Sequence, residues 1–341
     1  MDTWEPVVPP GYGDPNRAFL QAFMSRGTLT LAESQQIIAA ILNAGEAGDR
    51  NQVDPASITQ RDLDRFVHAA RSALSSLDYE ILRTQDQKTK EWVYALVNMH
   101  SDPATQLATT HTPDEISFIK RLLDAMFETY NTPRMEVMAV DEAQALKVSR
   151  PARPGRESNA NGDGEDSQAA AKDKGLKHSE VLTLLASLVA EGWLEKSRDG
   201  FYSLSMRSLL ELRTWLTATY NEPELEGEWQ HIKTCEGCKE IVTVGQRCAD
   251  RDCLTRIHDI CHDRVWPSQA DKKCPKCKKV WEGKHFVGER AVTATQAYKK
   301  GRRRGGERRS NLAEAIIAQE EGEEEVEEEA EAGDDDGEME E

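Results

Sequence analysis

Cysteine is missing from the first 234 residues of this 341-residue chain, and all seven cysteines lie between Cys235 and Cys277. Aromatic residues make up only 6% of the sequence, and no apolar run approaches the roughly 20 residues that a membrane-spanning helix needs. The first residues lack a basic stretch followed by an apolar one, so no secretory signal is expected. Gly-rich phosphate-binding loops and zinc-hydrolase motifs are also absent, which argues against a self-contained enzyme. We therefore expect a soluble intracellular chain, without a membrane segment, whose cysteines bind metal rather than form disulfides.

The strong negative charge belongs to one end of the chain. Of the net charge of −18, the residues from Glu320 onward supply 15 acidic groups and no basic one, which leaves about −3 for the rest. A basic run precedes this acidic block, and it consists of Lys299, Lys300, Arg302, Arg303, Arg304, Arg308 and Arg309. Such a run binds nucleic acid or other acidic partners, or directs nuclear import. Composition predicts that residues 290–341 are disordered, first basic and then acidic.

Residues 15–105, after a flexible stretch over 1–14, have the pattern of a winged helix. Apolar residues recur at helical spacing in three segments and then alternate in two further segments around a polar turn. The expected helices cover 17–26, 29–42 and 58–77, and the expected strands cover 79–83 and 91–97. Three helices followed by a hairpin is the order of elements in a winged helix.

The same order recurs over residues 110–222. A good helix cap at Thr112 precedes an apolar stripe, and a second helix is predicted over 178–191. Strands over 193–196 and 201–204 flank a turn that contains Asp-Gly, a strong hairpin signal. Residues 149–174 interrupt this unit as a disordered insertion, and a further helix is expected over 206–220. The predicted fold class is therefore α+β, with two winged helices.

The third helix of the first winged helix does not look like a DNA-reading helix. Its charged residues form a mixed face rather than a basic one, and they are Arg61, Asp62, Asp64, Arg65 and Arg71. We therefore expect protein–protein packing on this helix, and the basic run is the better candidate for a nucleic-acid contact.

Eight metal-binding residues fall into four close pairs within a domain predicted over residues 230–285. The pairs are Cys235 with Cys238, Cys248 with Cys253, His258 with Cys261, and Cys274 with Cys277. Eight such ligands suffice for two tetrahedral zinc sites, and a domain of about 45 residues needs metal for much of its folding energy. His262 is the alternative to His258, although the two-residue spacing to Cys261 favours His258.

This ligand pattern resembles the RING finger, a cross-brace in which the first and third pairs hold one zinc ion and the second and fourth pairs hold the other. The resemblance implies one site made of Cys235, Cys238, His258 and Cys261, and another made of Cys248, Cys253, Cys274 and Cys277. The PHD finger uses the same ligand order, but it carries an aromatic residue where Lys272 stands here.

The RING resemblance also implies a docking surface for a ubiquitin-conjugating enzyme. The Trp266-Pro267 and Cys274-Pro275 dipeptides are RING-like, so Val265, Trp266 and Pro275 are expected to form an apolar platform, with Trp266 as an exposed anchor. Lys278 stands where a cation contacts ubiquitin. Glu236-Gly237 replaces the large apolar residue that is usual before the second ligand, which predicts low activity for the chain alone.

Two winged helices followed by such a domain resemble the non-structural maintenance of chromosomes element 1 family, the RING-bearing subunit of the DNA-repair SMC complex. The resemblance runs from about Asn16 to Trp281 and is most specific in the eight ligands and Arg256-Ile257-His258. It implies a nuclear, chromosome-associated subunit with MAGE-domain and kleisin partners and contact with DNA through the complex.

The same resemblance implies RING-type ubiquitin ligase activity in DNA repair and recombination, without a catalytic residue of the chain's own. Such a ligase orients a conjugating enzyme's thioester for attack by a lysine. Two alternatives stay open at this point. One is a scaffold that binds partners through a purely structural zinc domain, and the other is a PHD-like chromatin reader.

Overall fold

The computed structural model describes residues 11–45, 52–99, 110–151, 173–221, 229–267, 272–304 and 311–320. They belong to two compact units, of which the first joins Met1–Asp102 with Ser205–Thr214 and the second joins Pro103–Leu204 with Trp215–Glu341. Within the described residues, no helix has both the length and the apolar character needed to cross a membrane. Residues 1–10 and most of the predicted insertion lie outside the described residues.

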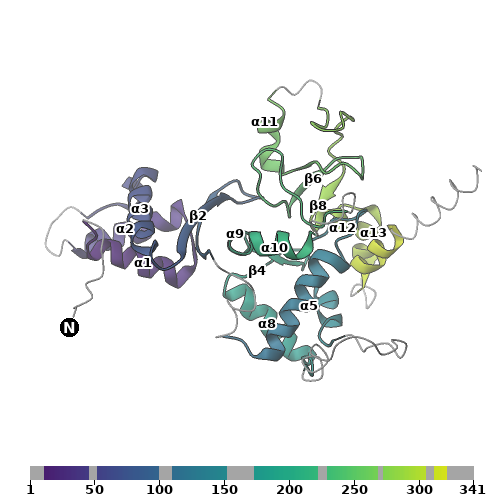
Figure 1. Ribbon diagram of the computed structural model, residues 1–341, viewed down its shortest axis with the longest axis horizontal. Coiled ribbons are helices and arrows are strands. Elements are labelled where there is room, and N and C mark those ends of the chain that lie inside the picture. Colours follow the sequence, from purple (N-terminus) through teal and green to yellow (C-terminus); the bar gives the residue numbers. More distant parts are fainter. Residues whose placement is uncertain are drawn as a thin grey trace, which may run out of the picture. The chain divides into compact units, whose positions relative to one another are not determined.

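The described part of the first unit combines the helices at the purple end of the chain (Figure 1) with a three-stranded antiparallel sheet, whose order is β1-β3-β2. Its elements are α1 (Asp14–Arg26), β1 (Thr28–Thr30), α2 (Leu31–Gly45), a 3-10 turn η1 (Pro55–Ser57), α3 (Gln60–Leu74), β2 (Tyr79–Gln85) and β3 (Trp92–Asn98). Strands β2 and β3 form the predicted hairpin. The predicted helix over 29–42 is wrong at its start, because Thr28–Thr30 pairs with β3 instead.

The apolar stripes seen in the sequence form the core of the first unit. Fully or almost fully buried side chains come from every helix and strand, and they include Phe19, Phe23, Leu29, Ile38, Leu63, Val67, Leu74, Ile81 and Tyr94. Helix α3 begins at a capping box, in which the Asp62 carboxylate accepts from the backbone N–H of Thr59 at 2.9 Å. The side chain of Arg71 donates to the carbonyl of Ile81 at 2.7 Å and so ties this helix to the sheet.

The helix expected over 206–220 is divided into two. Helix α9 (Met206–Glu211) belongs to the first unit, whereas α10 (Arg213–Tyr220) lies in the second from Trp215 onward. Helix α9 packs on β3, and the Glu211 carboxylate accepts from the backbone N–H of Asn98 at 3.4 Å. The predicted boundary 110–222 therefore differs from the structure over residues 205–214, which belong to the first unit.

The described helical part of the second unit is called the helical body below. It contains α5 (Pro113–Asp124), a π-helical turn η2 (Ala125–Thr129), α6 (Glu142–Lys147), α8 (His178–Ala190), the hairpin β4 (Leu194–Lys196) and β5 (Tyr202–Leu204), and α10. Helix α5 starts at the predicted cap, where the Thr112 hydroxyl and the Glu115 carboxylate form a capping box. The core includes Phe118, Leu122, Phe127, Val181, Leu185, Phe201 and Leu216.

The cysteine-rich domain, residues 229–287, carries a small sheet in the order β7-β6-β8 (Figure 1, green). Its elements are β6 (Gly245–Arg247), β7 (Arg256–Ile257), a 3-10 turn η3 (Asp259–Cys261), α11 (His262–Val265) and β8 (Phe286–Val287). The described chain continues through α12 (Arg290–Thr293), α13 (Gln296–Arg304) and a helix over 312–320.

The prediction that residues 290–341 are disordered is wrong for 290–304 and 311–320. Val292, Ile316 and Ile317 are buried, and the Tyr298 ring lies 6.4 Å from that of Phe201 in the helical body. These few apolar residues lie among many charged ones, so the average composition of the segment does not indicate that it folds. The acidic block from residue 321 onward, and Arg308 and Arg309, lie outside the described residues.

Candidate metal centre

The structure brings all eight predicted ligands together in two groups. The first cluster is Cys235, Cys238, His258 and Cys261, and the second cluster is Cys248, Cys253, Cys274 and Cys277. Within each cluster the ligand atoms lie within 4.8 Å of one another. The first and third pairs meet, as do the second and fourth, which is the cross-brace arrangement that the RING resemblance implies. The two clusters can hold two metal ions.

The first cluster has its histidine fixed in the tautomer that a metal needs. The Nδ1 atom of His258 lies 3.2 Å from the Cys238 sulfur and 3.9 Å from the Cys261 sulfur. Its other nitrogen, Nε2, lies 3.1 Å from the carbonyl oxygen of Ile241. An imidazole that donates from Nε2 to a carbonyl keeps the lone pair of Nδ1 free for a metal ion. His258 is therefore placed and oriented as a ligand of the first cluster would be.

His262, the alternative ligand, lies outside both clusters. Its Nε2 is 3.3 Å from the Oε1 atom of Gln246, and its ring packs against Trp266. Burial lowers the pKa of His262, and the neighbouring Lys272 lowers it further.

The second cluster has the dimensions of a tetrahedral sulfur site. The sulfur atoms of Cys248 and Cys277 are 3.4 Å apart, and those of Cys253 and Cys274 are 3.6 Å apart. Four sulfurs at about 2.3 Å from one metal ion would be about 3.8 Å apart, whereas a disulfide would need about 2.05 Å. All seven cysteines are free thiols, so metal ligation is the chemistry that this spacing fits.

The two Cys-x2-Cys turns are built alike. In each, the residue after the second cysteine has a positive φ, 65° at Lys239 and 64° at Lys278. Its N–H donates to the carbonyl of the first cysteine, Cys235 at 2.8 Å and Cys274 at 3.1 Å. This closed turn aims both sulfurs of the pair at one point. In the first turn the backbone N–H of Gly237 also donates to the Cys235 sulfur at 3.3 Å.

The surroundings of one thiol in each cluster lower its pKa. Hydrogen bonds with Cys238 first, and then with His258, lower the pKa of Cys235 to about 3. Burial alone would raise the pKa of Cys274, but hydrogen bonds from the Thr255 hydroxyl and the backbone of Cys277 lower it to about 6. Each cluster thus offers a thiolate near neutral pH, and binding a metal ion would release the remaining thiol protons.

Trp266 does not have the exposed position that was expected of a docking anchor. Only 9% of its surface is exposed, and its ring packs against Trp281 at 5.0 Å and His262 at 4.8 Å. Its Nε1 atom donates to the carbonyl of Lys273 at 2.9 Å. Trp266 therefore connects α11 to the turn of the second cluster from inside the domain, and the prediction of an exposed aromatic anchor is wrong.

The other three predicted docking residues are accessible. Val265 is half-buried, and Pro275 and Lys278 are exposed. A β-carbon built on Gly237 would lie 3.4 Å from the Val265 side chain, so these two residues adjoin. The Glu236 carboxylate joins the turns of the two clusters through Lys276 at 2.7 Å, and it also binds Lys239 at 2.7 Å.

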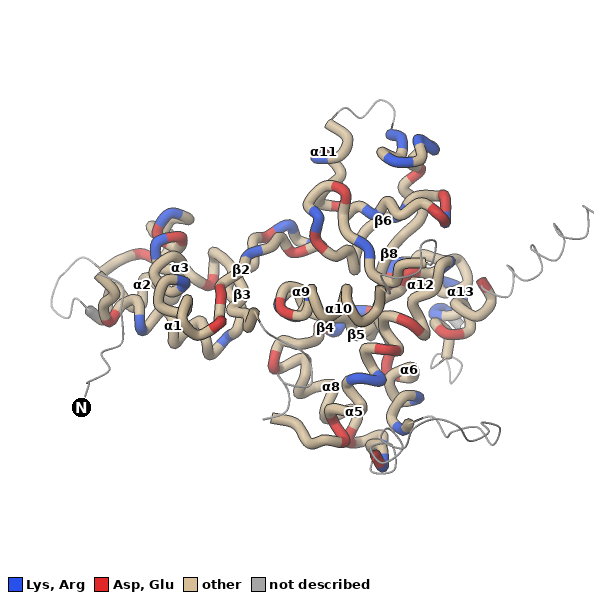
Figure 2. The backbone as a smooth tube through the Cα atoms, viewed as in Figure 1, with Lys and Arg blue, Asp and Glu red and all other residues tan. Residues whose placement is uncertain are grey.

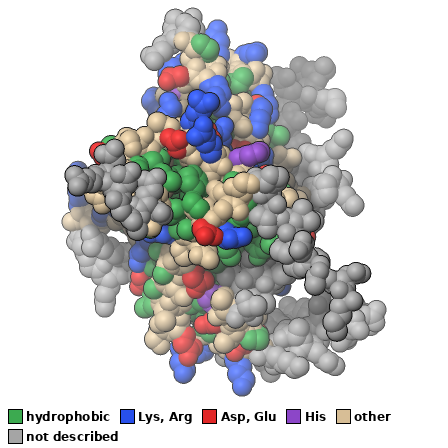
Figure 3. Space-filling model, turned by 90° about the vertical axis from the view of Figure 1, so that its left-hand side faces the viewer, with side chains coloured by type: hydrophobic (Ala, Val, Ile, Leu, Met, Phe, Trp, Pro, Cys, Tyr) green, Lys and Arg blue, Asp and Glu red, His purple; other side chains and the backbone are tan. Residues whose placement is uncertain are grey.

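Basic side chains dominate the turn of the second cluster and α13. Figure 2 shows Lys and Arg of the cysteine-rich domain in blue near α11, and the corresponding upper part of Figure 3 is also rich in blue side chains. In α13, Lys299, Lys300 and Arg303 are exposed, and Arg302 pairs with Asp199 of the helical body. The predicted basic run is therefore partly an anchored helix.

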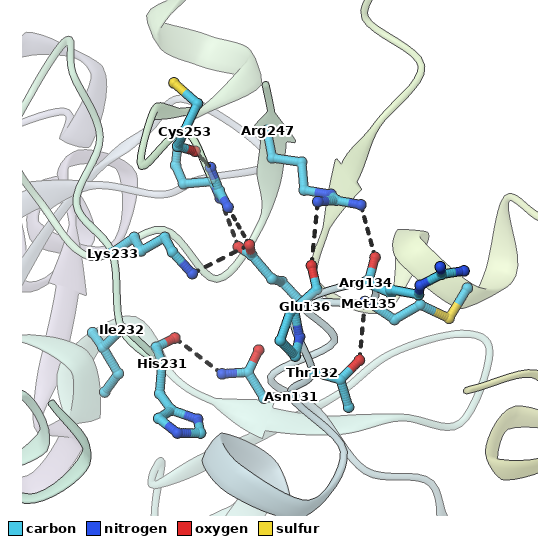
Figure 4. Close-up of polar contacts among 12 residues, drawn as sticks. Asn131, Thr132, Arg134, Met135, Glu136, His231, Ile232, Lys233, Arg247 and Cys253 are labelled. Carbon is cyan, nitrogen blue, oxygen red and sulfur yellow. Dashed lines mark hydrogen bonds and ion pairs between the residues drawn. The ribbon is translucent and has the colours of Figure 1, made fainter. Parts of the chain in front are cut away.

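A buried cluster of charges was missed by sequence reasoning. The Glu136 carboxylate, from the segment between η2 and α6, meets Arg256 and Lys233 of the cysteine-rich domain (Figure 4). Burial raises the pKa of Glu136, but Arg256 and Lys233 outweigh it and hold that pKa below its usual value. Burial lowers the pKa of Lys233 to about 8. Arg256 stood in the recognised Arg-Ile-His motif, whereas nothing in the sequence set Glu136 apart.

Comparisons with known proteins agree with this architecture. A family model described as the Nse1 non-SMC component of the SMC5-6 complex matches residues 16–212, and one described as a RING-like domain matches residues 235–277. The human non-structural maintenance of chromosomes element 1 homolog is 24% identical over 268 residues, which cover 79% of this chain and 84% of the relative.

Two further matches extend the comparison. Non-structural maintenance of chromosomes element 1 of Schizosaccharomyces pombe is 24% identical over 226 residues, covering 66% of this chain and 80% of the relative. A chain of a solved Nse1-Nse3-Nse4 complex superposes with a TM-score of 0.58 at 21% identity, covering 83% of this chain and 99% of that one. At this identity the structural match establishes the fold alone.

Proposed function

This chain belongs to the Nse1 family, the non-SMC component of the SMC5-6 complex, and we propose that it is a RING-type ubiquitin ligase subunit of such a complex. The observation that carries the proposal is the cross-brace, in which four ligand pairs alternate between two clusters. A RING uses this arrangement to hold two loops in a fixed relation. The match of residues 235–277 to a RING-like model favours this reading over a PHD-like chromatin reader.

The metal in both clusters is proposed to be zinc. Three thiolates with one imidazole, and four thiolates, are donor sets that zinc prefers in closed structural sites, whereas calcium and magnesium prefer oxygen ligands. Zinc here supplies folding energy and takes no part in group transfer. The backbone N–H donors to the cysteine sulfurs and the carbonyl that orients His258 fit this structural role.

The helical parts are proposed to be two winged helices that bind partner subunits. In the first unit, the order α1-β1-α2-α3-β2-β3 with sheet order β1-β3-β2 supports this assignment. In the helical body, α5, α6 and α8 followed by the β4–β5 hairpin support the second. The solved Nse1-Nse3-Nse4 complex that this fold matches supports a MAGE-domain subunit and a kleisin as partners.

The proposed ligase acts by positioning. The domain offers no nucleophile for ubiquitin, so its contribution would be to hold a conjugating enzyme in the orientation that favours attack on the thioester. Val265, which adjoins Gly237, and the exposed Pro275 would form the docking surface, and Lys278 would contact the bound ubiquitin. Trp266 would maintain the shape of this surface from inside the domain. We extend the proposal to DNA repair and recombination on nuclear chromosomes, where the basic helix α13 could contact DNA.

An in vitro ubiquitin-transfer assay tests the proposal. Transfer is to be measured with a panel of conjugating enzymes, for the chain alone and for the chain with MAGE-type and kleisin partners. Activity should be low for the chain alone and rise with the partners. The Val265→Asp variant should lose transfer while it keeps its metal content and partner binding. Leu254→Asp is the matched control, because Leu254 is 39% exposed in the same domain but belongs to the Cys253–His258 segment.

A purely structural zinc domain is the second candidate function. It is favoured by Glu236, whose ion pairs with Lys239 and Lys276 leave the expected docking site polar rather than apolar. Under this alternative, no conjugating enzyme supports transfer even with the partners present. Val265→Asp then behaves like Leu254→Asp in every assay.

A further inference from the structure

Glu136 is a fully buried carboxylate that belongs to the helical body but points into the cysteine-rich domain. Its side chain has no exposed surface, and neither has that of Arg256. The Oε2 atom of Glu136 accepts from Arg256 Nε at 2.7 Å, and its Oε1 atom accepts from Arg256 Nη2 and, at 3.2 Å, from Lys233 Nζ. A two-pronged contact of this kind fixes the orientation of the guanidinium as well as its position.

Arg256 in turn connects the two metal clusters. Its Nη1 atom donates to the carbonyls of Cys253, at 2.7 Å, and Thr255, at 2.8 Å, within the loop of the second cluster. Its own carbonyl accepts from the backbone N–H of Glu236, at 3.0 Å, in the turn of the first cluster. It also lies two residues before the ligand His258. The side chain of Arg256 thus contacts the loop of the second cluster, and its backbone carbonyl contacts the turn of the first.

The backbone around Glu136 adds further contacts to the cysteine-rich domain. Arg247, next to the ligand Cys248, donates to the carbonyls of Pro133 and Arg134, at 3.3 and 2.8 Å (Figure 4). The carbonyl of Glu136 accepts from Gly288 N–H at 2.7 Å, just after β8. The segment from Pro133 to Glu136 therefore contacts the cysteine-rich domain through its backbone carbonyls as well as through the Glu136 side chain.

We propose that Glu136 is a positioning residue for both metal clusters, so that retention of the two metal ions depends on a side chain of the helical body. This inference rests on the proposed metal binding of the cysteine-rich domain. The carboxylate holds the Arg256 guanidinium against the loop of the second cluster, and Arg256 holds the turn of the first. The nearest ligand of either cluster is about a hundred residues away in sequence, so local folding of the cysteine-rich domain cannot replace this contact.

Replacing Glu136 by glutamine keeps the shape of the side chain but removes its charge. Two buried cations, Arg256 and Lys233, then lose the only carboxylate that the described residues place against both of them. The amide also turns an N–H₂ group toward these donors. An uncompensated buried charge is costly, so the guanidinium should move and loosen the Cys253–Thr255 loop. Loss of groups that orient metal ligands typically costs about 10- to 100-fold in metal affinity.

The experiment measures zinc release from the full chain into a chromogenic chelator, with amide hydrogen exchange of residues 245–258 followed in parallel. Glu136→Gln should release both ions at least about 10-fold faster than the wild type and lose protection in this segment. The control is a core variant of the helical body, Leu185→Ala, which lowers thermal stability without touching Glu136. It should release zinc at the wild-type rate. Arg256→Lys should act like Glu136→Gln, and the double variant should be no worse than the stronger single variant.

Several outcomes separate this inference from the proposed function. If the wild type contains two zinc ions and Glu136→Gln releases them at the wild-type rate, the inference fails and metal binding stands. Equal acceleration by Leu185→Ala would also overturn it, since general destabilisation would then explain the effect. A wild-type chain without zinc would contradict the proposed metal binding itself, and the inference with it.

Discussion

Replacing Trp266 by alanine should destabilise the cysteine-rich domain rather than remove a contact to a partner. Trp266 is 9% exposed and packs between Trp281 and His262. Its indole N–H holds the backbone of Lys273, directly before the ligand Cys274. The substitution therefore removes the packing and the hydrogen bond that fix the turn of the second cluster to α11.

The expected size of the effect follows from burial. A tryptophan that buries about 200 Å² loses up to about 5 kcal/mol of transfer free energy on truncation, at about 25 cal/mol per Å². Buried aromatic residues replaced by alanine typically cost about 3–5 kcal/mol, and the lost hydrogen bond accounts for about 1 kcal/mol of this. Trp266→Phe keeps much of the apolar contact and should cost about 1–2 kcal/mol, mainly through the unpaired carbonyl of Lys273.

The assay is zinc release together with denaturant unfolding of the full chain. The control is Val265→Ala, because Val265 is half-buried and ends α11 directly before Trp266. Trp266→Ala should release zinc from the second cluster faster, and Trp266→Phe should lie between it and the wild type. Suppose instead that Trp266→Ala keeps wild-type stability and zinc release but loses ubiquitin transfer. Trp266 would then be an anchor for the conjugating enzyme, and the reasoning from its burial would be refuted.

Three further changes have definite expected results. Gly288→Ala should lower the free energy of unfolding in denaturant by about 2–4 kcal/mol. Gly288 has a φ of 85°, and the β-carbon of an alanine there would lie 2.2 Å from the carbonyl oxygen of Thr243; unchanged stability would contradict this. Thr112→Ala should lower the free energy of unfolding by about 1 kcal/mol in a thermal melt, since the capping box with Glu115 is lost; an unchanged melting temperature would contradict this. Zinc removal by a chelator should expose residues 235–287 to limited proteolysis and leave the first unit resistant; equal resistance of both would contradict a structural role for metal.

The metal-binding residues could be predicted from the sequence because metal chemistry is local and restrictive. Paired cysteines two residues apart require little beyond a turn, and the structure builds the two expected turns at Lys239 and Lys278. The choice of His258 over His262 also followed from spacing. The pairing of the clusters came from the RING resemblance, and the structure confirms it.

Long-range packing could not be predicted in the same way. Glu136 is one acidic residue among 61 Asp and Glu residues, and only the folded chain places it against Arg256. The short strand β1 and the division between α9 and α10 likewise depend on partners distant in sequence, β3 in both cases. The sequence predicts a surface position for Trp266, because sequence cannot tell an exposed tryptophan from one that is covered by Trp281.

The most direct test of the account is the metal content of the intact chain and of its two histidine variants by native mass spectrometry. The wild type should carry two zinc ions, and His262→Asn should also carry two. His258→Asn should carry fewer, because His258 alone offers a nitrogen to the first cluster. A wild-type chain with one zinc ion or none, or a loss of zinc in His262→Asn but not in His258→Asn, would contradict the two-cluster assignment.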